Sequence, residues 1–108
     1  MSKKAQLEAN KEVLEALYRF KDELENCTFS TGKRLRSCNA YVYETPSLYV
    51  LRSYNTAVAI IEKSTGTCYD FLRLVYGYTS TSAHHISKFD KDYGSKWDCN
   101  KRLTYKDV

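Results

Sequence analysis

The sequence predicts an α+β domain in which an N-terminal helix is followed by a four-stranded antiparallel meander and a C-terminal helix. Three observations predict this arrangement. Leucines recur with helical spacing within residues 1–26, segments rich in β-branched and aromatic residues fill 39–73, and helical spacing returns over 79–94. With 108 residues, the chain has the length of a single domain with one core.

The predicted N-terminal helix is amphipathic. No proline or glycine interrupts it, and Glu15 precedes Arg19 by four residues, which is the favourable order for an exposed pair. We expect the apolar side to pack on the sheet, and the alternative is that it binds a second copy of the chain or a partner. The side chains on that side are Leu7, Leu14, Leu17, Tyr18 and Leu24.

A basic segment, residues 27–38, separates the helix from the sheet. It contains the turn signal Ser30-Thr31-Gly32, followed by Lys33, Arg34 and Arg36. We expect an exposed, mobile loop that contributes little to the core. The net charge of the chain is +4, and the surplus lies in this loop and in the C-terminal third. Such a surplus attracts an acidic partner, either a nucleic acid or an acidic protein face.

The middle of the chain predicts four strands with short connections, which favour antiparallel pairing. Ala57–Ile61 is apolar without interruption, so we expect that strand to be central and covered on both faces. Gly66 stands in the last turn, where a positive φ is available to glycine. The predicted strands are Ala40–Thr45, Leu48–Tyr54, Thr56–Glu62 and Thr67–Leu72.

The C-terminal helix is predicted over residues 79–94, and its apolar side includes Ile86 and Phe89. We expect these two side chains to anchor the helix on the sheet. The tail, residues 95–108, places Trp97 among charged residues. Docking on the domain and fraying are both consistent with this tail.

The sequence indicates no catalytic residue, metal site or cofactor. His84 and His85 are adjacent, and neighbouring residues on a helix point about 100° apart, so one pocket can hardly use both. No C-x-x-C pair and no glycine-rich phosphate loop occur. We expect free thiols in a reducing cytosol, a Cys27–Cys38 disulfide being the alternative in an oxidising compartment. The cysteines are Cys27, Cys38, Cys68 and Cys99.

Binding is indicated by an unusual number of tyrosines, ten in the chain. Tyr41 and Tyr43 are expected on one face of a strand, with Tyr49 on the next strand. Aromatic side chains on a sheet beside basic loops are typical of nucleic-acid stacking platforms, although tyrosine is also a favoured strand residue. The predicted partner-binding residues are Lys33, Arg34, Arg36, Tyr41, Tyr43, Tyr49, Lys88 and Lys91.

Two segments, SYNTAVAI at 53–60 and YGYTSTSAHHISKF at 76–89, occur on either side of the Gly66 turn. Together they resemble a family of small uncharacterised proteins encoded by bacteriophages and other mobile elements of Gram-positive bacteria. The resemblance covers about residues 48–94 and implies an origin rather than a chemistry. The matching positions are Ser53, Tyr54, Thr56, Val58, Ala59, Tyr78, Thr81, Ser82, His85, Ile86, Lys88 and Phe89.

These features predict a binding protein rather than an enzyme. The first hypothesis is a phage or mobile-element accessory protein that binds and inhibits a host protein, with an anti-CRISPR-type inhibitor of a CRISPR effector nuclease as the concrete form. The alternative is a small nucleic-acid-binding regulatory module. The segment after Met1 is charged, and Ala57–Ile61 is far shorter than the roughly 20 residues that span a bilayer. We therefore expect no membrane partner and a cytoplasmic location, as a monomer or a homodimer.

Overall fold

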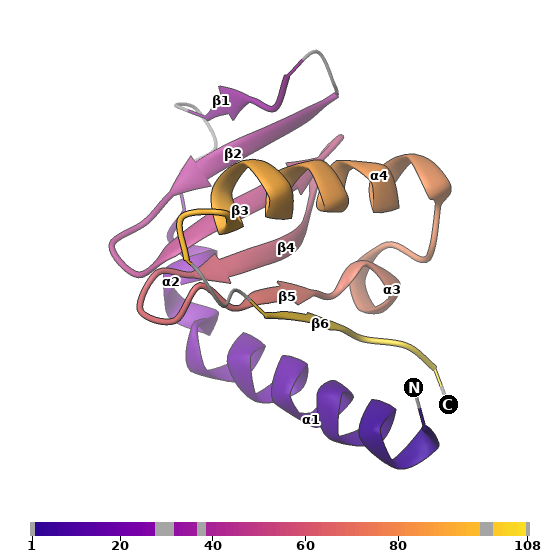
Figure 1. The fold of residues 1–108 in the computed structure, drawn as a ribbon. Helices are drawn as coiled ribbons and strands as arrows, with labels where there is room; N and C mark the ends of the chain where they lie inside the picture. The colour runs from indigo at the N-terminus through magenta and orange to yellow at the C-terminus, as the bar shows by residue number, and fades with distance from the viewer. Residues whose placement is uncertain (1, 28–31, 37–38, 98–100, 108) are drawn as a thin grey trace.

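Helices cover both faces of one mixed sheet in the computed structural model, which describes residues 2–27, 32–36, 39–97 and 101–107 (Figure 1). The first helix, α1 (Lys3–Arg19), lies on one face, and α4 (Ser80–Phe89) lies on the other. The fold is therefore α+β with an N-terminal helix, as the sequence predicts. Among the described residues, no helix combines the length and the apolar character needed to cross a bilayer.

The sheet has six strands in the order β1-β2-β3-β4-β5-β6. The first five form an antiparallel meander, and β6 pairs parallel to β5. The prediction of a central strand covered on both faces is confirmed, because β4 is internal and Val58 to Ile61 are all 0% exposed. The strands are β1 (Lys33–Arg34), β2 (Ala40–Glu44), β3 (Leu48–Ser53), β4 (Thr56–Glu62), β5 (Cys68–Asp70) and β6 (Arg102–Thr104).

The prediction of a four-stranded, purely antiparallel sheet is wrong at both edges. The strand β1 falls in the segment expected to be a loop, and β6 falls in the tail, which docks. Both strands are too short and too polar to show an alternating pattern in the sequence. They form because the edge of the sheet beside them has backbone groups that need hydrogen-bond partners. Cys68 N donates to Lys101 O at 2.7 Å, and Tyr105 N donates to Asp70 O at 2.9 Å.

The helical regions are more divided than the sequence suggests. The N-terminal helix ends at Arg19, and α2 (Lys21–Glu25) follows after Phe20, whose φ of −102° and ψ of 13° are not helical. A short helix that the sequence does not predict, α3 (Leu72–Val75), follows β5. The predicted C-terminal helix is α4 followed by a π-helical segment, η1 (Asp90–Gly94).

The outward side of α1 is the side that the sequence assigns to the core. Leu7 and Leu14 are 49% and 48% exposed and Tyr18 is 82% exposed. The buried side consists instead of small and polar residues. The prediction that the leucine side of the helix packs on the sheet is therefore wrong for these three residues. The buried residues of α1 are Gln6, Ala9, Asn10, Val13 and Ala16.

The physical reason is the backbone of the C-terminal segment, which the inward side of α1 must satisfy. Asn10 Nδ2 donates to Lys106 O at 2.7 Å, and Lys106 N donates to Asn10 Oδ1 at 3.0 Å. Gln6 Nε2 donates to Thr104 O at 2.8 Å and to Asn10 Oδ1 at 2.7 Å. Amides reach these groups because the neighbouring small residues, such as Ala9, allow close approach. A leucine side could not form these hydrogen bonds.

On the opposite face, α4 packs as the sequence predicts. Ile86 and Phe89 are both 0% exposed and belong to one core cluster with Leu51 and Ile61. Thr79 caps the helix, with Oγ1 accepting from Ser82 N at 3.1 Å.

The turn before β5 also behaves as predicted, because Gly66 has a φ of +78°. A Cβ at this position would lie 2.4 Å from Cγ of Trp97. Glycine is therefore required here both for its backbone conformation and for the close approach of the indole ring. The same contact shows that the beginning of the predicted tail packs on the domain.

Candidate functional site

Two tyrosine rings and two lysines meet where β3 begins and η1 ends. The ring centroids of Tyr49 and Tyr93 are 5.2 Å apart, with planes inclined at 53°. Lys96 Nζ lies 4.6 Å from the centroid of Tyr49 and donates to its hydroxyl at 2.7 Å. Lys63 Nζ lies 5.0 Å from the same centroid. These are cation–π distances, so the Tyr49 ring already contacts two ammonium groups.

Glu44 lies among these lysines and accepts a 2.5 Å hydrogen bond from Lys63 Nζ. This hydrogen bond is the main cause of a lowered pKa for Glu44, with further contributions from the charges of Lys96 and Lys33. Three ammonium groups around one carboxylate leave two positive charges in excess. A groove of about 270 Å³ opens here. We call this set the lysine–tyrosine surface: Lys33, Glu44, Tyr49, Lys63, Tyr93 and Lys96.

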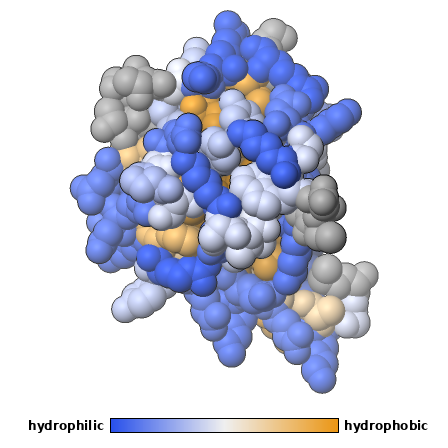
Figure 2. Space-filling model, turned by 60° about the vertical axis from the view of Figure 1, so that its left-hand side comes forward, coloured by the Kyte–Doolittle hydropathy of each residue, from blue (hydrophilic) through white to orange (hydrophobic). Residues whose placement is uncertain are grey.

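The side of the molecule that carries the β2–β3 and β4–β5 turns is mostly hydrophilic. Figure 2 shows it with polar and intermediate side chains over most of its area and only small hydrophobic areas between them. A partner that binds there must therefore offer charged or hydrogen-bonding groups.

The structure assigns different positions to the three predicted basic-segment residues. Lys33 and Arg34 form β1, and Leu35 behind them is 2% exposed. Arg36 donates from Nε to Oδ2 of Asp92 in η1 at 2.8 Å and from Nη2 to Oδ1 at 2.5 Å. This hydrogen bonding lowers the pKa of Asp92. The expectation of a basic loop with no role in folding is therefore wrong for these residues.

The predicted tyrosines do not form one platform. In the β2–β3 register, Tyr43 pairs with Val50 and Glu44 pairs with Tyr49. Neighbouring residues of a strand point to opposite faces, so Tyr43 and Tyr49 lie on different faces of the sheet. Tyr49 packs against the core cluster on the α4 side, and Tyr43 belongs to the cluster on the α1 side. Tyr43 is 5% exposed, and Tyr41 beside it is 37% exposed. Tyr43 also lines the groove, but it is almost fully buried, so Tyr49 alone among the three contributes an accessible ring to the lysine–tyrosine surface.

The remaining members of the surface were missed from the sequence. Lys63 lies in the β4–β5 turn, and Lys96 follows η1. Tyr93 and Lys96 are three residues apart, and this helical spacing was a usable signal for their proximity. The predicted Lys88 is half-buried on α4 and Lys91 is exposed in η1. Neither is among the described residues that line the groove.

The two segments that carry the family resemblance meet at a buried hydrogen-bonded cluster. Ser53 Oγ lies 2.8 Å from His85 Nδ1 and 2.9 Å from Ser82 Oγ. The Tyr54 ring centroid lies 5.9 Å from that of His85. Ser53 and Ser82 are each 1% exposed, so their hydroxyl groups are shielded from solvent. The cluster therefore links the β3–β4 hairpin to α4 by hydrogen bonds. His84, the neighbour of His85, is exposed to solvent.

Acidification is expected to destabilise the protein through His85. Burial lowers its pKa from 6.5, with help from the charges of Lys88 and His84. The unfolded chain therefore binds a proton at a higher pH than the native protein does, and stability falls as the pH drops below about 6.5. Denaturant unfolding at pH 7.5 and 5.5 checks this. His85→Asn should remove most of the pH dependence. His84→Asn should reduce it only slightly, because the charge of His84 is the smallest of the three causes that lower the pKa of His85. Equal pH dependence in all three proteins would contradict the assignment.

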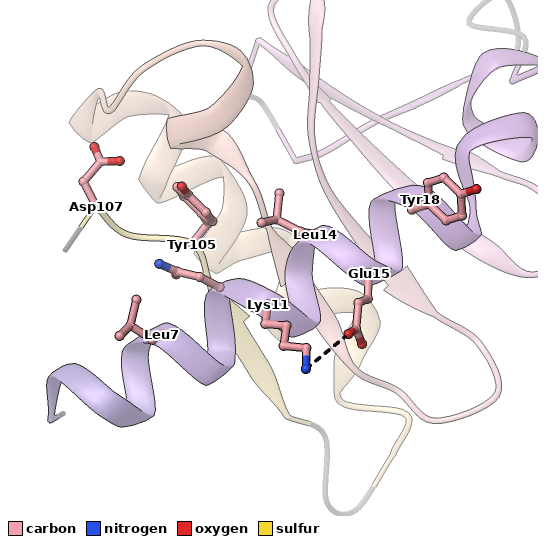
Figure 3. A pocket seen from close by; sticks show the side chains of 8 residues that line it. Leu7, Lys11, Leu14, Glu15, Tyr18, Tyr105 and Asp107 are labelled. Carbon is pink, nitrogen blue, oxygen red and sulfur yellow. Dashed lines mark ion pairs between the residues drawn. The ribbon is translucent and has the colours of Figure 1, made fainter.

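The outward residues of α1 line a second, larger groove of about 610 Å³ (Figure 3). Leu7, Leu14 and Tyr18 form its apolar part along the helix, and Tyr105 and Asp107 of the C-terminal segment lie on its other side. The helical spacing of the sequence predicts these residues to share one side of the helix, which the structure confirms for Leu7, Leu14 and Tyr18. The sequence does not predict that this side faces outward, because the contacts that turn Gln6 and Asn10 inward have no sequence pattern of their own.

The histidine, cysteine and acidic residues of 2–27, 32–36, 39–97 and 101–107 are the candidate metal ligands that the structure describes. No three of these described side chains lie close enough together to hold an ion. Cys27 and Cys68 are free thiols. Burial raises the pKa of Cys68 well above its usual range and also raises that of Cys27. Cys38 and Cys99, and with them the Cys27–Cys38 disulfide, lie outside the described residues.

One comparison finds a family for this chain. The model of a family of unknown function, DUF8033, matches residues 4–105, which include every strand of the sheet. The match extends well beyond the two segments on which the resemblance to small uncharacterised proteins depends. No curated protein and no solved structure matches the chain.

Proposed function

The chain belongs to the DUF8033 family, and we propose that it works by binding the acidic face of a partner protein through the lysine–tyrosine surface. The observation that carries this proposal is the gathering of three lysines around Glu44: Lys63 donates to this carboxylate, and Lys33 and Lys96 line the same groove. A carboxylate of a partner that enters the groove replaces water around Lys33 and Lys96 and adds the negative charge that the site lacks. The half-buried tyrosine rings beside it supply the aromatic contact area that binding hot spots favour.

Base stacking is less well supported at this surface. A stacking platform needs free ring faces. The Tyr49 ring contacts two ammonium groups, Tyr43 is 5% exposed, and Tyr41 lies on the other face of the sheet. Nucleic-acid binding remains the second candidate function because surplus cations also attract phosphate groups.

The finer form of the proposal is an accessory protein of a phage or mobile element that inhibits a host protein, with a CRISPR effector nuclease as the concrete target. Its support is the small size of the chain, the surplus of positive charge and the resemblance of residues 48–94. A nuclease is a protein whose own substrate is acidic. A basic inhibitor therefore needs an acidic region of the enzyme outside the nucleic-acid channel.

Paired charge-removing variants test the proposal. Lys33→Ala/Lys96→Ala should bind a polyglutamate peptide about tenfold more weakly than the parent at low salt, and added salt should reduce the difference. The matched control, Lys3→Ala/Lys21→Ala, removes the same charge from exposed positions on α1 and α2. It should bind the peptide more nearly as the parent does. Thermal unfolding should be nearly unchanged in both variants because the altered lysines are exposed.

Two outcomes count against this function. Equal loss of peptide binding in both double variants would show attraction by net charge alone, without a site. Stronger binding of a single-stranded oligonucleotide than of polyglutamate, again weakened by Lys33→Ala/Lys96→Ala, would favour the second candidate. Isothermal titration at two salt concentrations measures all of these affinities.

A further inference from the structure

The outward stripe of α1 has the spacing of a two-helix seam. Leu7, Lys11, Leu14 and Tyr18 follow one another at intervals of four, three and four residues. This spacing characterises the contact line of helices that pack along each other with a small crossing angle, and three of the four residues here, all except Lys11, are apolar or aromatic. The exposed fractions of Leu7, Leu14 and Tyr18 are 49%, 48% and 82%, so the described part of the chain leaves the stripe uncovered.

We propose that this stripe pairs with the same stripe of a second copy of the chain, with the two α1 helices antiparallel. A twofold axis that crosses the helix between residues 12 and 13 places Leu7 opposite Tyr18 of the second copy. The same axis places Lys11 opposite Leu14 of the second copy. Every seam residue then faces another seam residue, as an isologous interface requires.

Charge selects the antiparallel direction. Lys11 Nζ and Glu15 Oε1 lie 3.9 Å apart within one helix, and their side chains are 77% and 62% exposed. In the antiparallel pair, the residue opposite Glu15 of the second copy is Asn10, and Lys11 is its neighbour in the chain. Lys11 of each copy therefore lies near Glu15 of the other copy, and these opposite charges attract across the axis. A parallel pair in register would place Lys11 against Lys11, and like charges at close range oppose association.

The shape of the groove suits a helix. It has a volume of about 610 Å³ and lies between the stripe and the side chains of Tyr105 and Asp107 (Figure 3). The 17 residues of α1 give a helix about 25 Å long. The tyrosines of the lysine–tyrosine surface pack on the core cluster beneath α4, on the face of the sheet opposite to α1. Pairing through α1 therefore leaves that surface accessible on both copies.

Mass measurement tests the pairing. Sedimentation equilibrium of the full chain should show a concentration-dependent rise from 12.6 kDa towards twice that mass. Leu14→Lys should raise the dimer dissociation constant at least about 100-fold, because each dimer then holds two lysines in place of leucines, each opposite Lys11 of the other copy. Leu74→Lys introduces the same change at a leucine of α3 that is 39% exposed and should leave the constant unchanged.

A charge swap separates self-pairing from other occupants. Lys11→Glu and Glu15→Lys should each weaken the dimer by about 3- to 10-fold, and the double variant should restore it because both copies change together. A mass of 12.6 kDa at every concentration would overturn the proposal, as would a dimer that survives Leu14→Lys. A monomer that binds an amphipathic helical peptide in this groove would identify a different occupant. Lys33→Ala/Lys96→Ala should dimerise as the parent does, so this test and that of the proposed function fail separately.

Discussion

Replacing Phe89 with alanine is expected to lower the free energy of unfolding by about 3–5 kcal/mol, the usual cost of emptying a buried aromatic site. Phe89 is 0% exposed, and its ring centroid lies 5.7 Å from that of Tyr93. Its removal leaves a cavity between α4 and the sheet. The loss is a large part of a typical domain stability of about 5–15 kcal/mol. Urea denaturation followed by circular dichroism measures the change.

The control for this variant is Tyr78→Ala, which truncates an aromatic residue that is 58% exposed. It should cost less than about 1 kcal/mol because little buried area is lost. A denaturation midpoint for Phe89→Ala close to that of Tyr78→Ala would contradict the packing of α4. Phe89→Leu, which retains most of the apolar volume, should recover much of the lost stability.

Phe89 also supports the candidate site. Tyr93 lies between Phe89 and Tyr49, with ring centroids 5.7 Å from the first and 5.2 Å from the second. The buried Phe89 side chain thus holds the Tyr93 ring of the lysine–tyrosine surface in place. We therefore expect Phe89→Ala to weaken polyglutamate binding even at temperatures where the protein remains folded, because Tyr93 loses the side chain behind it.

The predicted elements that the structure confirms are those with a strong local pattern. The strands β2, β3 and β4 begin at the predicted residues, since apolar and aromatic residues fill them and turn residues separate them. In α4, Ile86 and Phe89 are three residues apart and both point inward. The edge strands lack such a pattern. In β6 only Leu103 is apolar, and the strand exists because β5 has an unpaired edge.

The candidate site could be predicted only in part because its residues come from five separate segments. Lys33 and Tyr49 were identified from the sequence, but the register of β2 and β3 decides which tyrosines share a face. Lys63 reaches Tyr49 from the β4–β5 turn, 14 positions further along the chain. Contacts of this kind depend on tertiary structure and have no periodic signal.

The facing of α1 shows how a hydrogen-bond requirement overrides hydrophobic patterning. An amphipathic helix normally turns its largest apolar side chains inward. Here the partner of the helix includes the segment 104–106, whose backbone groups need donors and acceptors. Asn10 bonds both the N–H and the C=O of Lys106, and Gln6 bonds the C=O of Thr104. Leaving such groups buried and unpaired costs about 1–3 kcal/mol each, so amides are favoured over leucines at these positions.

Asn10→Leu is accordingly expected to destabilise the protein by about 2–3 kcal/mol, although it places an apolar residue on the inward side of a helix. Asn10 is 7% exposed and exchanges two hydrogen bonds with Lys106 while accepting a third from Gln6. Leucine fills a similar volume but leaves these groups without their partner. The measurement is urea denaturation, together with amide hydrogen exchange at Lys106, which should become faster as the C-terminal segment detaches from α1.

The matched control is Glu8→Leu, which makes the same kind of change at an exposed position two residues earlier in α1. It should alter stability by less than about 0.5 kcal/mol. If hydrophobic patterning determined how α1 faces the sheet, Asn10→Leu would stabilise the protein and the exchange at Lys106 would stay slow. Destabilisation with fast exchange at Lys106 identifies the amide contacts as the interaction that turns Leu7, Leu14 and Tyr18 outward. In that case the exposed stripe of α1 is a consequence of how the C-terminal segment is held, and its exposure persists for as long as that segment stays docked.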